Sequence, residues 1–122
     1  MPIRVMVVED NDVFRSALEV LLTLDGDIEI AGSAPDGEDV VERCRQLDPD
    51  VLLVDYRLPG LDGVQVTRLV REQLPDVAVV ALTAAAEPRE RKALIDAGAE
   101  ACIGKDRPLD EIVAAVREAA WS

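Results

Sequence analysis

Short apolar runs without polar alternation constrain the fold of this chain more than any other feature. Three valine-rich runs cover Ile3 to Val8, Val51 to Val54 and Val77 to Leu82. A strand with one face in water alternates polar and apolar residues, whereas a strand covered on both faces does not. Two weaker runs, Ile28 to Ala31 and Ala101 to Ile103, complete a set of five. The runs therefore predict five strands in a parallel sheet that is covered on both faces.

Helical patterns separate these runs, because apolar residues recur every three or four positions in the segments between and after them. Asp12 is the expected N-cap of the first helix, and Gly26 lies just past its end. A second helix is predicted between Asp36 and Pro49, and a third ends before Pro75. A fourth is predicted from Pro88 to Ala97 with Gly98 as C-cap, and a fifth from Leu109 to about Ala120. Alternating strands and helices with right-handed crossovers form an α/β sandwich. A single domain over residues 1–122 accounts for the chain.

Charge and composition exclude several functions. The chain has 13 basic and 25 acidic residues and a formal charge of −12, so we expect no direct binding to nucleic acid or to an anionic membrane. The lack of histidine excludes Ser-His-Asp and Cys-His catalysis and histidine metal ligands. Cys44 and Cys102 lack C-x-x-C spacing and are expected to be reduced, partly buried thiols. No run has membrane-spanning length and no secretion signal is present, which predicts a cytoplasmic protein.

Polar residues follow four of the five predicted strands. Glu9 and Asp10 come after the first strand, Asp55 after the third, Thr83 after the fourth and Lys105 after the fifth. Ligands of open α/β sheets bind beyond the carboxyl ends of the strands, so these side chains are candidates for one site.

The residue types at these positions suit phosphoryl transfer. Crowded carboxylates repel one another unless a cation intervenes, and Mg²⁺ suits a site with few carboxylates and an incoming phosphate. Lys105 supplies a positive charge for a phosphoryl oxygen, and Thr83 supplies a hydroxyl donor. A carboxylate nucleophile, a metal, an ammonium and a hydroxyl form a site that works largely by electrostatics.

Each candidate residue also has a purely structural interpretation. Glu9 and Asp10 are equally explained by a loop and a helix start, Thr83 by strand propensity and Lys105 by an ordinary surface lysine. Asp55 is harder to explain in this way, because a charge that ends a buried strand is costly without a partner. The recurrence of such residues at four strand ends favours the functional interpretation.

The sequence resembles the receiver domains of bacterial two-component response regulators along essentially its whole length. The matching segments are VVED at 7–10, DYRLPGLDG at 55–63, ALTA at 81–84, and GA at 98–99 leading to Lys105. The second segment, with its turn residues, is the most specific. The stretch from Gly98 to Asp106 is most similar to receivers joined to LuxR-type helix-turn-helix output domains.

This resemblance implies a flavodoxin-like (βα)5 fold with strand order 2-1-3-4-5 and a Mg²⁺-dependent site. Asp55 is then the phosphoacceptor for a sensor histidine kinase, and Thr83 and Lys105 contact the phosphoryl group. The implied metal ligands are Asp10, Asp55 and the backbone carbonyl of Arg57, with Glu9 as the other member of the acidic pair. Small Ala84 leaves the approach open, and the variable positions Arg57 and Ala85 influence the phosphoryl lifetime.

The resemblance also implies a switching surface and an output. Phosphorylation is expected to shift Thr83 and its loop, and to bias the surface of the helices at 88–97 and 109–120 and the strand between them, where partners or a second copy would bind. Such a module supports only its own phosphorylation and dephosphorylation and is no enzyme otherwise. Two departures are Cys102, where the family usually has an aromatic residue, and Asp106, where many members have proline.

Several alternatives stay open at this point. Because the sequence stops at Ser122, we interpret it as either a truncated transcription regulator without its output domain or a stand-alone receiver. A receiver-like module that works without phosphate is a second alternative. A third is an aspartate-nucleophile phosphatase of the haloacid dehalogenase type, since Asp10-Asn11-Asp12-Val13 superficially fits its opening motif.

Overall fold

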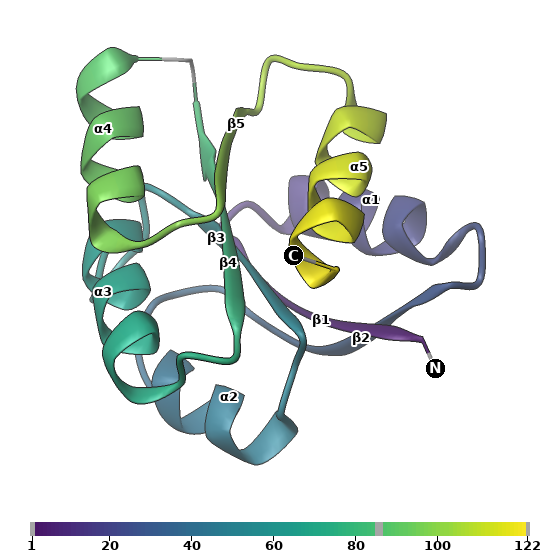
Figure 1. Cartoon of the computed structure of the whole chain (residues 1–122). Helices are drawn as coiled ribbons and strands as arrows, with labels where there is room; N and C mark the ends of the chain where they lie inside the picture. Colours follow the sequence, from purple (N-terminus) through teal and green to yellow (C-terminus); the bar gives the residue numbers. More distant parts are fainter. Residues whose placement is uncertain (1, 85–86, 122) are drawn as a thin grey trace.

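The apolar runs form the strands of one parallel sheet (Figure 1). The computed structural model of the chain describes residues 2–84 and 87–121. The strands pair in the order β2-β1-β3-β4-β5, and all four pairings are parallel. Their bounds are β1 Ile3–Val8, β2 Ile28–Ala34, β3 Val51–Asp55, β4 Ala78–Thr83 and β5 Ala101–Gly104. The predicted fold class and strand order are confirmed.

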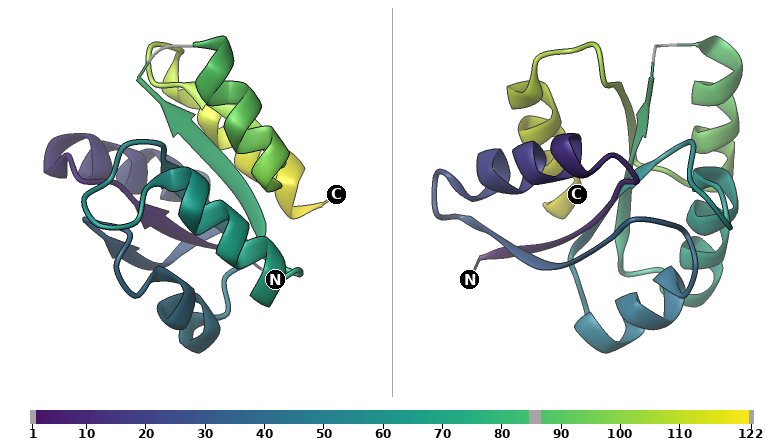
Figure 2. Two further views of the ribbon diagram at one scale, coloured as in Figure 1. Left: turned by 90° about the vertical axis from the view of Figure 1, so that its left-hand side faces the viewer. Right: turned by 180° about the vertical axis from the view of Figure 1, so that it is seen from behind.

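Five helices cover the two faces of this sheet (Figures 1 and 2). Helices α1 and α5 lie on one face, and α2, α3 and α4 lie on the other. Their bounds are α1 Asp12–Thr23, α2 Val40–Leu47, α3 Gly63–Gln73, α4 Pro88–Ala97 and α5 Leu109–Ala120. None of the described helices is long and apolar enough to cross a membrane.

The two hydrophobic cores explain why the central strands show no polar alternation. Successive side chains of a strand point to opposite faces, and both faces here are apolar. In β3, Leu53 packs with α1 and α5, whereas Leu52 and Val54 pack with α2, α3 and α4. The same division holds in β1 and β4. Burial on both sides therefore produces the continuous valine-rich runs.

The start of α1 differs from the prediction by one residue. Asn11, not Asp12, is the N-cap, and its side-chain oxygen accepts a hydrogen bond from the Phe14 N–H at 2.9 Å. Asp12 lies in the first turn and pairs with Arg15 at 2.6 Å. Aspartate and asparagine are similarly good caps, so the sequence alone does not distinguish the two neighbours. The predicted starts of α4 and α5 agree with the structure.

The turn from β3 to α3 requires a glycine beside Asp55. A Cβ atom on Gly63 would lie 2.4 Å from the Asp55 carbonyl oxygen and 2.8 Å from the Tyr56 Cα, both too close for a side chain. Asp62 caps α3 in a reciprocal capping box with Gln65, which fixes the direction of the helix. The Asp-Gly pair thus holds the backbone at the end of β3 in place.

Candidate functional site

The strand order brings the predicted site residues to one edge of the sheet. Strand β3 lies between β1 and β4, and β5 lies beside β4. In this register Asp55 faces Leu82, the residue before Thr83, and Thr83 faces Gly104, the residue before Lys105. The Lys105 N–H donates to the Thr83 carbonyl oxygen at 2.6 Å.

Three carboxylates gather at this edge. Glu9, Asp10 and Asp55 each offer a carboxylate oxygen, and these oxygens lie within 4.8 Å of one another. Glu9 is 0% exposed and Asp55 is 4% exposed, whereas Asp10 is open to solvent. Oxygen-only donors at this spacing fit a hard divalent cation such as Mg²⁺. Glu9 and Asp55 thus supply negative charge from the buried side of the cluster, and the exposed Asp10 leaves the cluster accessible from solvent.

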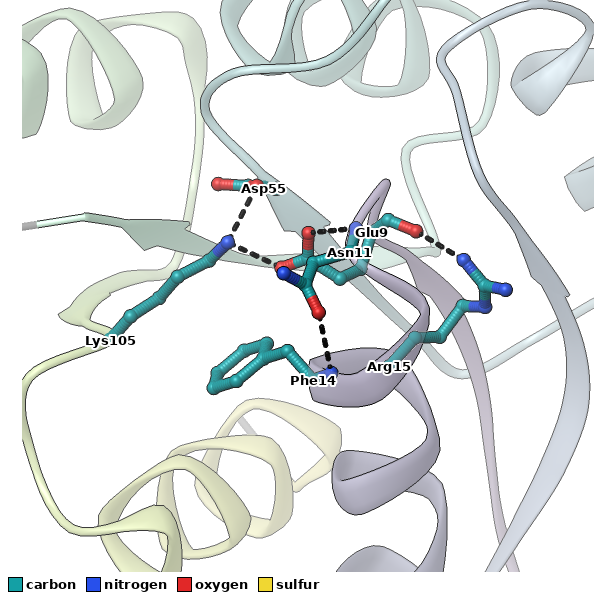
Figure 3. A network of polar contacts seen from close by, with 6 residues as sticks. All are labelled: Glu9, Asn11, Phe14, Arg15, Asp55 and Lys105. Carbon is teal, nitrogen blue, oxygen red and sulfur yellow. Dashed lines mark hydrogen bonds and ion pairs between the residues drawn. The ribbon is translucent and has the colours of Figure 1, made fainter.

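The Lys105 ammonium lies between two of these carboxylates (Figure 3). Its Nζ is 2.7 Å from Asp55 Oδ2 and 2.5 Å from Glu9 Oε1. Burial lowers the pKa of Lys105, but hydrogen bonds to Asp55 and Glu9 outweigh that effect and hold the pKa above its usual value. The lysine is therefore charged at neutral pH and offsets part of the negative charge of the cluster.

Glu9 is held by contacts with Asn11, Arg15 and Lys105. Its Oε2 accepts a hydrogen bond from the Asn11 N–H at 3.0 Å, and its backbone carbonyl oxygen accepts one from Arg15 Nη1 at 2.7 Å (Figure 3). Apart from the ion pair with Lys105, Oε1 has no partner among the described residues. Burial raises the pKa of Glu9, and the Asn11 N–H and Lys105 lower it only in part. An additional cation at this oxygen would therefore stabilise the ionised form.

The raised pKa of Glu9 leads to a stability prediction. Its carboxylate ionises less readily in the folded chain, so ionisation destabilises the fold as pH rises from the ordinary value of 4.5 through the raised folded value. Glu9→Gln should therefore increase the free energy of unfolding at pH 7 without Mg²⁺, and should have little effect below pH 4.5, where Glu9 is neutral in both states. Urea unfolding at both pH values measures this, with Glu42→Gln on the exposed surface as control. A less stable Glu9→Gln variant at pH 7 would contradict it.

Thr83 and Cys102 form a buried pair next to this site. Both side chains are buried, and their strands β4 and β5 are neighbours in the sheet. Burial raises the pKa of Cys102, and the contacts with Arg91 and Thr83 lower it only in part. Cys102 and Cys44 are free thiols, as predicted, but both are fully rather than partly buried. A small buried thiol here thus influences, and is influenced by, the polar side chain that is the candidate phosphoryl contact.

Arg57 connects the end of β3 to α4. Its side chain is 76% exposed, its Nη2 lies 3.6 Å from Glu90 Oε2, and its guanidinium lies 5.9 Å from the centre of the Tyr56 ring. Burial raises the pKa of Glu90, with Glu87 acting in the same direction. Ala84 is exposed directly after β4, and Ala85 lies outside the described residues.

Several residues that hold the site were not predicted from the sequence. Asn11, Phe14 and Arg15 contact Glu9 or Lys105, and Glu90 contacts Arg57. The helix-start position of Asn11 was a usable signal. The sequence gives no comparable signal for Glu90, because this residue lies in a charged segment typical of an exposed helix.

Comparison with known proteins identifies the relatives of this chain. Residues 5–117 match a protein family described as the response regulator receiver domain. The chain is 38% identical over 116 residues to the response regulator GacA of Pseudomonas viridiflava, which covers 94% of this chain and 54% of that protein. It is 33% identical over 118 residues to the response regulator protein VraR of Staphylococcus saprophyticus, which covers 97% of this chain and 56% of that protein.

A solved structure supports the same relationship. The signal receiver domain of the response regulator NarL from Mycobacterium tuberculosis superimposes with a TM-score of 0.94 at 36% identity, covering 99% of this chain and 98% of that one. The chain spans about half the length of the curated relatives it matches.

Proposed function

The chain belongs to the family of response regulator receiver domains, which are signalling modules, and from this premise we propose that Asp55 accepts a phosphoryl group from a partner histidine kinase. The observation that carries the proposal is the buried Asp55 carboxylate at the end of β3, paired with Lys105 and close to Glu9 and Asp10. A carboxylate oxygen attacks phosphorus, the bond from phosphorus to the imidazole nitrogen of the donor breaks, and an acyl phosphate forms on Asp55.

The residues around Asp55 have separate roles in the proposed transfer. Lys105, held by Asp55 and Glu9, places a positive charge where the negative phosphoryl group arrives. Thr83 presents a hydroxyl from the adjacent strand, and small Ala84 leaves the approach to Asp55 open. Charge added at Asp55, about −1.5 to −2 units on phosphorylation, would then draw the Thr83 hydroxyl and its loop toward the site.

Mg²⁺ would be held by Asp10, Asp55 and the backbone carbonyl of Arg57, with Glu9 completing the acidic cluster. When bound, the ion neutralises charge on the transferring group. The close spacing of the three carboxylates and the raised pKa of buried Glu9 both support a cation at this position.

Intact-mass spectrometry tests the proposed function directly. The chain is incubated with Mg²⁺ and acetyl phosphate, a small phosphodonor that removes the need for the kinase. We expect the mass of one phosphoryl group to be added, and chelation of the metal to prevent the addition. An unchanged mass in the presence of both reagents would refute phosphoacceptance.

Asp10→Asn should weaken Mg²⁺ binding strongly while the fold is retained. The substitution removes one charge from an exposed position in the cluster, and even outer-shell partners change metal affinity by about tenfold or more. Titration calorimetry of the unphosphorylated chain measures the loss. Asp12→Asn is the matched control, because the Asp12 side chain is 83% exposed and pairs with Arg15 instead. Equal affinities for the wild-type chain and Asp10→Asn would place the metal elsewhere.

The same contacts argue against the phosphatase alternative. That alternative needs the two aspartates of Asp10-Asn11-Asp12 to act at one site, but Asp12 pairs with Arg15 outside the carboxylate cluster. Turnover of a generic phosphate ester would revive it, whereas stoichiometric labelling supports the receiver function.

The output and the partners belong to the same proposal. The half-length match to GacA and VraR supports regulation of transcription through an output domain of a longer protein, with the face of α4, β5 and α5 as the switching surface for a partner or a second copy. The free buried thiols favour a cytoplasmic location. The net charge of −12 opposes direct DNA binding by this chain.

A further inference from the structure

We propose that the ring of Phe14 is a positioning element for Lys105, which it holds through a cation–π contact in the orientation that serves phosphoryl transfer. The inference rests on the proposed role of Asp55 as phosphoacceptor. Phe14 lies on α1 and Lys105 follows β5, so the two residues are far apart in the sequence. The Lys105 Nζ lies 4.9 Å from the centre of the Phe14 ring, within the range of a cation–π interaction (Figure 3).

The ring occupies a side of the ammonium that the carboxylates leave open. An ammonium carries three N–H donors, and the atoms paired with the Lys105 ammonium are the oxygens of Asp55 and Glu9. Figure 3 shows the Phe14 ring on the side of the lysine that faces α1, away from Asp55. The Lys105 side chain is only 21% exposed, and partial removal from water strengthens an interaction between a cation and a ring face.

The position of the Phe14 ring is set by the core and by Asn11, which also contacts Glu9. Phe14 packs against the core shared by α1 and α5, and its backbone N–H donates to the Asn11 cap at 2.9 Å. The N–H of Asn11 in turn donates to Glu9 Oε2 at 3.0 Å. A closed chain of contacts therefore runs from Glu9 through Asn11 and Phe14 to Lys105 and back to Glu9. The start of α1 thus sets the position of the lysine as well as that of the acidic residue.

An aliphatic side chain would fill the same space without the negative face of a ring. Lys105 would then be held by the carboxylates alone, and it would be free to turn toward Glu9 when Asp55 reacts. The aromatic ring supplies attraction from a fixed direction that the reaction does not change. We therefore expect the rate of phosphorylation to depend on the electrostatic potential of the ring and not only on its shape.

The composition of the chain permits a direct test, because Phe14 is its single phenylalanine. Biosynthetic replacement of phenylalanine by 4-fluoro-, 3,5-difluoro- and 3,4,5-trifluorophenylalanine changes this ring alone. Each fluorine withdraws charge from the ring face with little change in shape. Rates of Asp55 labelling by acetyl phosphate and Mg²⁺ should fall stepwise, by about two- to tenfold at the trifluoro ring, which is within the range of cation–π strengths.

Two controls separate position from folding. The urea midpoint should fall by no more than the weakening of one cation–π contact allows, so that every variant stays folded in the rate assay, and the same series in a Lys105→Met background should show no trend in rate. Phe14→Tyr should retain the wild-type rate, and Phe14→Leu should match or exceed the loss at the trifluoro ring. Equal rates along the series in the wild-type background, or the same trend in the Lys105→Met background, would overturn the inference. Failure of the unfluorinated chain to accept any label would instead refute the proposed function.

Discussion

Asp55→Asn is expected to abolish phosphoryl uptake from acetyl phosphate while the chain stays folded. The amide that replaces the carboxylate is a poor nucleophile and forms no acyl phosphate, so the loss should be complete rather than partial. The fold should tolerate the change, because asparagine has nearly the same shape and the Lys105 ammonium keeps Glu9 as its partner. Removing one of two buried carboxylates also reduces repulsion in the cluster.

Intact mass followed by peptide mapping measures this result. Asp96→Asn is the matched control. Asp96 lies on the exposed surface of α4, where it forms an ion pair with Lys92. The control should accept one phosphoryl group at the wild-type rate. Label of equal stoichiometry on Asp55→Asn would refute the assignment of Asp55, and peptide mapping would then show which other carboxylate accepts the group.

The site could be located from the sequence because strand ends are marked by burial. Leu52 and Leu53 are covered on opposite faces of the sheet, so their run stops where the chain leaves the core, at Asp55. The carboxyl ends of parallel strands share one edge, and this brings Lys105 to Asp55 across 50 positions of sequence. Only the types of the strand-end residues and the order of the strands were needed for that prediction.

The supporting contacts could not be predicted in the same way, because they depend on how each helix is rotated against the sheet. Phe14 belongs to the apolar face of α1 and would be assigned to the core by its spacing alone, yet its ring also contacts the Lys105 ammonium. Glu90 lies among charged residues that are typical of an exposed helix, but packing of α4 buries it beside Arg57. Periodicity gives the face of a helix and not the neighbour that the face meets.

Lys105→Met should have three effects that distinguish a functional lysine from a structural one. Labelling of Asp55 should slow markedly, because the positive charge that meets the phosphoryl group is lost. Affinity for Mg²⁺ should rise, because the ammonium no longer competes for the oxygens of Asp55 and Glu9. Without metal the fold should lose about 3 kcal/mol of stability, because removal of one partner leaves buried charge uncompensated.

The raised pKa of Lys105 sets the pH at which this stability difference is seen. A lysine whose folded pKa lies above the ordinary 10.5 stays charged at all lower pH values, so its contribution is full there while its carboxylate partners are ionised, and it is lost at high pH as pH rises through the folded value. The difference between wild type and Lys105→Met should therefore be large at pH 7. It should shrink in two situations: on acidification, as the buried Glu9 carboxylate, whose pKa is raised, takes up a proton, and at saturating Mg²⁺, since a ligand that binds the folded state stabilises it.

Urea unfolding with and without Mg²⁺, calorimetric titration of the metal and the rate of labelling together measure these effects. Lys92→Met is the matched control, because it removes the same side chain from an exposed pair with Asp96 on α4, where solvent screening leaves an ion pair with little effect on stability. If Lys105 served the fold alone, Lys105→Met would lose stability but would bind Mg²⁺ no more tightly and label at the wild-type rate once refolded with the metal. A rise in metal affinity together with a fall in labelling rate requires that one ammonium both occupies the carboxylate cluster and acts on the incoming phosphoryl group.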